Sequence, residues 1–181
     1  MTQDEALDRR LASEAAHGSD AAFESLVRRH QGFVRGFLRR LTQNPAAADD
    51  LAQETFVKAW RGIAAWRGDA SFRTWIARVA YTAFLQATRG ARRALARDTA
   101  WAAEAETFTE DAAGVDARLD VDRVMAALTP EQRAVMALIY GEGLSQAEAA
   151  DALGLPLGTV KSHVTRGRAR ALALFEEADR S

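Results

Sequence analysis

Apolar residues recur at intervals of three and four along most of the chain, and this spacing limits the fold more than any other feature. No stretch shows the sustained apolar–polar alternation of a half-buried strand. A stripe at this spacing occupies one face of an α-helix, so the sequence predicts an all-α protein. The clearest stripe lies between residues 19 and 41 and consists of Phe23, Leu26, Val27, His30, Phe33, Val34, Phe37, Leu38 and Leu41.

Helix-start signals divide the rest of the first half. Asn44 followed by Pro45 predicts a second helix that ends near Ile63. Ser71 is the expected N-cap of a third helix over residues 72–93. Residues 94–115 are rich in Ala, Glu, Asp and Thr, and we expect a linker there with at most transient helix.

Capping boxes mark two helix starts in the second half. Thr129 has a glutamine three residues on, and Ser145 has a glutamate at the same distance. The predicted helices cover 119–128, 130–140 and 146–153, and Gly154 suits a left-handed turn before a final helix. The residues expected to point inward from that final helix are Val160, Val164, Leu172 and Phe175.

The charge is segregated along the chain, although 24 Lys+Arg nearly balance 25 Asp+Glu. Residues 71–97 and 154–174 carry basic residues and no acid, whereas residues 98–122 carry eight acids and a single arginine. Two basic blocks separated by an acidic one indicate two anion-facing modules on a tether. We expect such modules to bind DNA weakly when free, because a loose tether loses entropy when both engage.

Several classes of protein are excluded by what the sequence lacks. There is no cysteine, and the three histidines are scattered, so disulfides, thiolate zinc sites and a histidine metal cluster are not expected. The first ten residues do not resemble a signal peptide, and no run of about 18 apolar residues could span a membrane. We therefore expect a soluble, cytoplasmic protein without cofactors.

The segment from 146 to 174 has the pattern of a helix-turn-helix, in which a short capped helix and a tight turn precede a basic second helix. In this motif the second helix lies in the major groove of DNA, where hydroxyl and basic side chains reach base edges and phosphates. A structural hairpin with a solvated basic face is the alternative. The outward residues of the second helix are Thr159, Lys161, Ser162, His163, Thr165 and Arg166.

Two further patterns each allow more than one interpretation. Aromatic and arginine residues alternate between Phe72 and Phe84, which suits stacking of unpaired bases but suits an ordinary core stripe better. Asp49, Asp50 and Glu54 cluster on one helix face, where they could form a metal or acid–base site, a solvated face or a docking face. No histidine or glycine-rich loop accompanies them, so catalysis is not expected.

Two groups of motifs resemble the bacterial sigma-70 family. Residues 49–56 (DDLAQETF), 60–61 (WR) and 72–76 (FRTWI) look like region 2 of that family. Residues 128–133 (LTPEQR), 143–145 (GLS) and 158–162 (GTVKS) resemble region 4. The length and the two regions are similar to the extracytoplasmic-function (ECF) group, which keeps only these regions. The resemblance implies two helical domains, one for each region.

On this resemblance we divide the chain into four parts. They are an N-terminal extension (1–18), region 2 (19–93), a flexible acidic linker (94–118) and region 4 (119–181). In the family the linker threads toward the RNA exit path and the active-site cleft. An acidic segment would suit a route normally taken by nucleic acid.

The resemblance also assigns roles to residues. The family's aspartate–glutamine–glutamate face binds the clamp helices of the polymerase β′ subunit, and it corresponds to Asp49, Asp50, Gln53, Glu54 and Phe56. Capture of the melted strand at the minus-10 element points to Trp66, Arg67, Arg73, Thr74, Arg78 and Thr82. Reading of the minus-35 element points to Thr159, Lys161, Ser162, His163, Thr165 and Arg166.

The sequence departs from the family pattern at three positions. Thr82 stands where many relatives carry asparagine, and Gln86 where they carry aspartate or asparagine, so base preference is not carried over there. Gly167 replaces a usual alanine, which should cost about 1 kcal/mol of helix propensity.

The function implied is that of an initiation factor, with no catalytic residues of its own. It would bind core RNA polymerase through the β′ clamp helices and the β flap, direct it to specific promoters and help to melt them. A cognate anti-sigma factor and a stress or envelope response are also implied. The alternatives are a dimeric helix-turn-helix regulator and a metal-dependent phosphohydrolase that uses Asp50 and Glu54.

Overall fold

The computed structural model describes residues 3–98 and 116–178, and within these ranges every regular element is helical. This confirms the all-α prediction. The first half contains α1 (Gln3–Ala16), α2 (Asp20–Thr42), α3 (Pro45–Gly62), the 3₁₀ turn η1 (Ile63–Ala65) and α4 (Phe72–Asp98). The second half contains α5 (Asp116–Ala126), α6 (Pro130–Met136), the π-helical turn η2 (Ala137–Gly141), α7 (Gln146–Leu153) and α8 (Leu157–Ala178).

Polar side chains cap the starts of several helices. Ser19 accepts a hydrogen bond from the backbone N–H of Ala22 at 3.3 Å and starts α2. Asn44 accepts from Ala47 at 3.0 Å and starts α3, with Pro45 in its first turn. Both capping boxes of the second half are formed, which confirms the predicted starts of α6 and α7.

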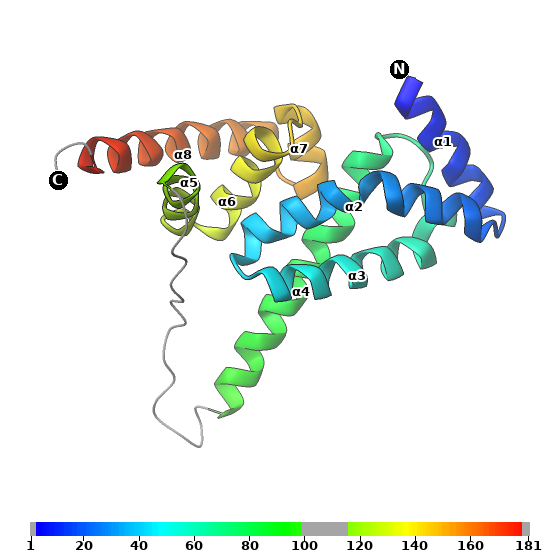
Figure 1. The fold of residues 1–181 in the computed structure, drawn as a ribbon, viewed down its shortest axis with the longest axis horizontal. Helices are drawn as coiled ribbons and strands as arrows, with labels where there is room; N and C mark the ends of the chain where they lie inside the picture. Colours follow the sequence, from blue (N-terminus) through cyan, green and yellow to red (C-terminus); the bar gives the residue numbers. More distant parts are fainter. Residues whose placement is uncertain (1–2, 99–115, 179–181) are drawn as a thin grey trace.

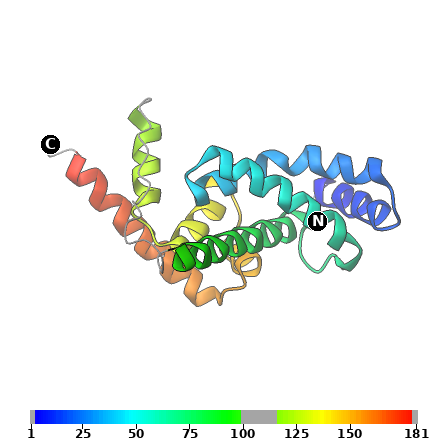
Figure 2. The same cartoon turned by 90° about the horizontal axis from the view of Figure 1, so that it is seen from below.

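The two halves pack into one body around a continuous hydrophobic core (Figures 1 and 2). Helices α2, α3 and α4 pack on one another, and α6, α7 and α8 form the second group. Helix α4 lies along α7, and α2 packs against α6 and η2. The core therefore joins Phe37 and Leu38 of α2 to Val135 and Leu138 of the second half.

Three features differ from the sequence-based expectation. Helix α1 was not predicted, and α4 continues to Asp98, five residues into the expected linker. The acidic residues at positions 99–115 lie outside the described residues. In the second half, η2 replaces the last turn of the helix predicted over 130–140.

The inward orientation predicted for four residues of the final helix is wrong for two of them. Val160 is fully buried and Val164 is 6% exposed, as expected. Leu172 and Phe175, in contrast, are 61% and 47% exposed. The reason is visible in Figure 1, where the C-terminal part of α8 extends past α6 and α7 and only α5 lies near it.

Candidate nucleic-acid interface and docking face

The acidic face of α3 points outward along its N-terminal half. Asp49, Asp50, Gln53 and Glu54 are exposed, while Leu51, Ala52 and Thr55 on the opposite face are buried. Val57 is 49% exposed beside these acids, and Phe56 is half-buried against the core. An apolar residue within an acidic stripe is more typical of a protein-docking surface than of a purely solvated face.

Nearby basic residues pair with only some of these acids. Asp49 lies 3.3 Å from Arg35, and Glu54 lies 2.6 Å from Lys58. The same Lys58 also donates to Gln86 at 2.5 Å. With the described residues, Asp50 and Gln53 make no hydrogen bond or ion pair, so their polar groups are available to a partner.

The loop between η1 and α4 carries the first residues predicted to contact DNA. Arg67 is exposed and lies 3.3 Å from Asp69. Trp66 is half-buried and packs near Phe72 and Trp75, with ring centroids 5.7 and 6.4 Å apart. Its indole N–H is buried and has no hydrogen-bond partner among the described residues.

The aromatic residues of α4 serve mainly as core. Phe72, Tyr81 and Phe84 are buried, as the core interpretation of this stripe predicts. Thr74 is 3% exposed, its hydroxyl lies 2.9 Å from that of Ser71, and its N–H donates to the same Ser71 oxygen at 3.1 Å. Thr74 therefore stabilises the start of α4 from inside the bundle and is not on the exposed face with Arg73 and Arg78.

Arg73 and Arg78 reach across to the second half of the chain. Arg73 donates to the carbonyl of Glu142, and Arg78 Nε donates to the carbonyl of Asp151 at 3.0 Å. Thr82 is exposed one turn further along α4 and donates to the carbonyl of Arg78 at 2.8 Å. Two of the basic residues predicted to hold the opened strand are thus occupied within the chain itself.

Glu142 is the centre of this contact between the halves. Its carboxylate receives a hydrogen bond from Arg40 Nη1 at 2.6 Å. Burial raises the pKa of Glu142, although Arg40 and Arg73 oppose this shift. Gly36 leaves room for this carboxylate, since a Cβ at that position would lie 2.5 Å from one of its oxygens and would displace it.

The helix-turn-helix has the predicted geometry. Gly154 ends α7 with φ of 66°, a left-handed conformation that glycine adopts without strain. Val160 and Val164 pack α8 into the core, and the residues between them face outward or lie at the edge. Lys161, Thr165 and Arg166 are exposed, and Thr159, Ser162 and His163 are half-buried.

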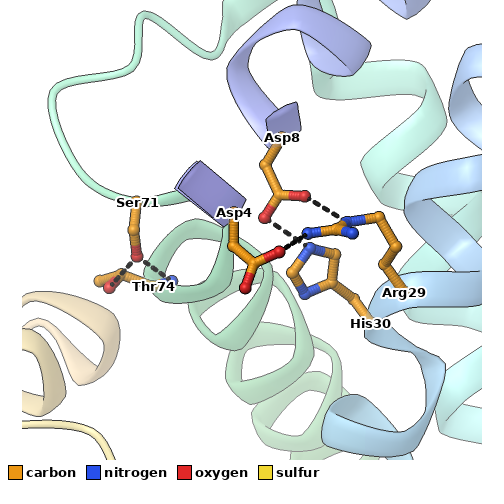
Figure 3. Close-up of polar contacts among 6 residues, drawn as sticks. All are labelled: Asp4, Asp8, Arg29, His30, Ser71 and Thr74. Atoms are coloured by element: carbon orange, nitrogen blue, oxygen red, sulfur yellow. Dashed lines mark hydrogen bonds and ion pairs between the residues drawn. The ribbon is translucent and has the colours of Figure 1, made fainter. Parts of the chain in front are cut away.

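A polar cluster that was not predicted from the sequence attaches α1 to the bundle (Figure 3). Asp8 is 6% exposed and accepts hydrogen bonds from Arg29 at 2.7 Å and His30 at 2.9 Å. Asp4 accepts from the same Arg29 at 2.9 Å. A signal was present in the Arg29–His30 pair, because His30 falls on the apolar stripe of α2 and a buried imidazole needs a polar partner.

His30 is best described as neutral at pH 7. Burial lowers its pKa, with Arg29 and Arg73 acting in the same direction and Asp8 opposing them. Because Arg29 already neutralises the buried Asp8 carboxylate, the imidazole need not be charged to donate to it. The cluster is therefore an attachment between helices.

The described parts of the chain contain no group of three or more His, Asp or Glu side chains that could hold a metal ion. Asp50 and Glu54, the residues of the metal-dependent alternative, are exposed on α3. Among the described helices, none is long and apolar enough to cross a membrane.

Comparisons with known proteins agree with this geometry. The profile described as "Sigma-70 region 2" matches residues 26–94, and "Sigma-70, region 4" matches residues 118–170. The first match contains α3 and most of α4, and the second contains α7 and the part of α8 up to Arg170. Helix α1 lies outside both.

Curated relatives match along most of their length. "ECF RNA polymerase sigma factor SigM" of Mycobacterium tuberculosis is 35% identical over 163 residues, which cover 89% of this chain and 82% of the relative. "RNA polymerase sigma-H factor" of Pseudomonas aeruginosa is 32% identical over 181 residues, covering 93% and 92%. The chain belongs to the sigma-70 family.

Solved structures place the chain in the same class. The structure of CnrH with the cytosolic domain of CnrY has a TM-score of 0.71 and 30% identity, covering 94% of this chain and 98% of that one. The sigma factor RpoE of Bartonella quintana, crystallised with the anti-sigma factor NepR, gives 0.72 and 25%, covering 85% and 96%. Together with the curated relatives, they identify the chain as an ECF sigma factor.

Proposed function

We propose that this protein binds core RNA polymerase, directs it to a particular class of promoters and helps to open the DNA there. The observation that carries the proposal is the exposed α3 face of Asp50, Gln53 and Glu54 on the same chain as a well-formed helix-turn-helix. One surface suits a protein partner and the other suits duplex DNA. The protein would act as an initiation factor, and we propose no catalytic role for any of its residues.

The α3 face would meet the clamp helices of the β′ subunit. Its free carboxylate and amide would pair with basic and polar groups of the coiled coil, and exposed Val57 would add apolar contact. Asp49 and Glu54 would exchange their present partners, Arg35 and Lys58, for partners on the polymerase. Such exchange costs little, because exposed ion pairs contribute only about 0–1 kcal/mol.

The minus-10 surface would consist of Trp66, Arg67, Arg73, Arg78 and Thr82. Its two α4 arginines are bound to carbonyls of the second half in the free chain. We therefore expect the halves to separate when polymerase binds, which would release both guanidinium groups to the opened strand. The minus-35 surface on α8 would use the exposed Lys161, Thr165 and Arg166 for direct contacts, and the β flap would hold this half in place.

An anti-sigma factor is the expected regulator. Two similar solved structures are complexes, one of CnrH with the cytosolic domain of CnrY and one of the sigma factor RpoE with the anti-sigma factor NepR. A partner of this kind would act on the present chain if it stabilised the packing of the two halves. The protein would then take part in a stress or envelope response and would act in the cytoplasm.

Charge reversal on α3 tests the docking assignment. Asp50→Lys combined with Glu54→Lys should abolish co-elution with core polymerase on gel filtration, because two cations would face basic groups of the partner. The matched control is Glu24→Lys, since Glu24, like Glu54, is exposed and pairs with a basic residue one turn on. Co-elution of the double variant at wild-type level, with helicity unchanged, would contradict the assignment.

A further inference from the structure

A cavity of about 260 Å³ lies between α1 and the loop that precedes α4. Its polar side chains are the guanidinium groups of Arg9 and Arg67, the hydroxyl of Ser13 and the indole of Trp66. No carboxylate lines it. Every one of these side chains has hydrogen-bond donors, and only the serine hydroxyl can also accept.

Arg9 holds the wall of the cavity in place. Its Nη2 donates to the carbonyl of Gly68 at 2.7 Å. Gly68 has φ of +76°, and a Cβ there would lie 3.4 Å from Arg9 Nη1. The glycine allows the left-handed turn of the loop, and a Cβ there would make only ordinary contact with the guanidinium group. That group has five N–H donors and retains others for a ligand.

The neighbouring residue fixes α1, and therefore Arg9, on the bundle. Asp8 is bound by Arg29 and His30 in the buried cluster of Figure 3. Arg9 is exposed on the next position of the same helix. A guanidinium group presented from an anchored helix loses less side-chain entropy on binding than one on a free terminus.

We propose that this cavity binds a backbone phosphate of the opened DNA strand, with Arg9 and Arg67 as its ligands. A phosphate presents only acceptors, which suits a lining of donors, and arginine matches its geometry with paired N–H groups. A base would present donors as well as acceptors. The ring of Trp66 is also packed on Phe72 and Trp75 and its N–H is buried, which favours a role as a wall of the cavity.

The inference rests on the proposed function, because the loop of Trp66 and Arg67 is the one expected to meet the melted strand. It adds a contact from α1, which lies outside the residues 26–94 that match region 2. The strand would be held at one phosphate by α1 and the loop together. Its neighbouring bases would remain free to meet α4.

The test is a phosphate scan with the complex of core polymerase and the full chain. A forked promoter fragment is made with one uncharged methylphosphonate at a time in the single-stranded part, and its dissociation constant is measured. We expect one replacement to weaken wild-type binding by about tenfold, the effect of one charge-assisted contact. Arg9→Ala should weaken binding of the unmodified fragment by a similar factor and be insensitive to that replacement.

Two further variants separate a phosphate contact from general effects. Arg10→Ala removes the same charge from the adjacent position, where the side chain lies 3.8 Å from Glu14 and does not line the cavity. We expect it to keep the wild-type scan. Arg9→Lys keeps the charge, so it should retain sensitivity at the same phosphate even if affinity falls.

Three results would overturn the inference. The first is a wild-type dissociation constant that no methylphosphonate replacement changes. The second is an Arg9→Ala variant whose binding is still weakened by the replacement that weakens wild-type binding. The third is the same set of dissociation constants for Arg9→Ala and Arg10→Ala. Displacement of the fragment by inorganic phosphate, beyond chloride of equal ionic strength and with a flat scan, would assign the cavity to a free anion instead. Co-elution with polymerase and transcription by the wild-type chain are measured in parallel, and their loss would count against the proposed function itself.

Discussion

At the scale of single residues, the structure explains the unusual Gly167 of α8. A Cβ at this position would lie 2.8 Å from the sulfur of Met136, so an alanine would force that side chain to move. Met136 is buried together with Met125 and Leu128 in a small separate cluster. The lost helix propensity of about 1 kcal/mol therefore accompanies close packing of α8 on α6. Sequence alone could not show this, because the contact joins residues 31 positions apart.

The buried His30 predicts a pH dependence of stability. Because its pKa is lowered on folding from 6.5, the unfolded chain takes up the proton more readily. The contribution of neutral His30 to the free energy of unfolding is fully present above pH 6.5 and is lost as the pH falls through the lowered pKa. We expect the free energy of unfolding in urea to fall between pH 7.5 and 5.5, and to fall less in His30→Gln, which can still donate to Asp8. Equal pH dependence in both proteins would contradict this account.

At the scale of elements, local signals located most helices and failed where tertiary packing decides. Three helices are capped as predicted, by Asn44, Thr129 and Ser145, because the hydrogen bonds involved span three residues. The attachment of α1 and the burial of Thr74 depend on residues far away in sequence. So does the exposed end of α8, where an apolar stripe continues beyond the elements that could cover it.

The recognition helix gives a prediction at this scale. Lys161→Ala and Arg166→Ala should each weaken promoter-specific transcription, by about 1–3 kcal/mol where the side chain makes a good base contact. The comparison is Arg170→Ala, one turn beyond Arg166 on the same exposed helix. Transcription is measured on a promoter used by the wild-type chain. Normal initiation by the double variant would refute the proposed role of α8.

At the scale of the whole molecule, the charge pattern indicated two modules on a tether, and the structure shows them packed together. The arginines of the contact lie in the first half and their acceptors in the second, so no local sequence pattern reveals the contact. Arg40 and Arg73 of the first half both bind Glu142 of the second. The weak DNA binding expected of the free chain would then have a second cause, because Arg73 and Arg78 are occupied.

Charge reversal at Glu142 tests whether this contact keeps the chain closed. Glu142→Lys would remove the partly buried ion pair with Arg40 and place a cation beside Arg40 and Arg73. We expect a larger radius of gyration by small-angle X-ray scattering and tighter binding of single-stranded DNA by the free chain. Glu24→Lys, an exposed site on α2, is the control. A compact Glu142→Lys variant with unchanged DNA affinity would show that other contacts hold the halves together.

The most direct test of the central claim is run-off transcription with purified core polymerase on genomic fragments, with and without this chain. The account predicts transcripts that require the chain and start at a fixed distance from two shared upstream elements. Start sites are mapped by sequencing the 5′ ends. If core polymerase that responds to another sigma factor makes no additional transcripts with this chain, the account is contradicted.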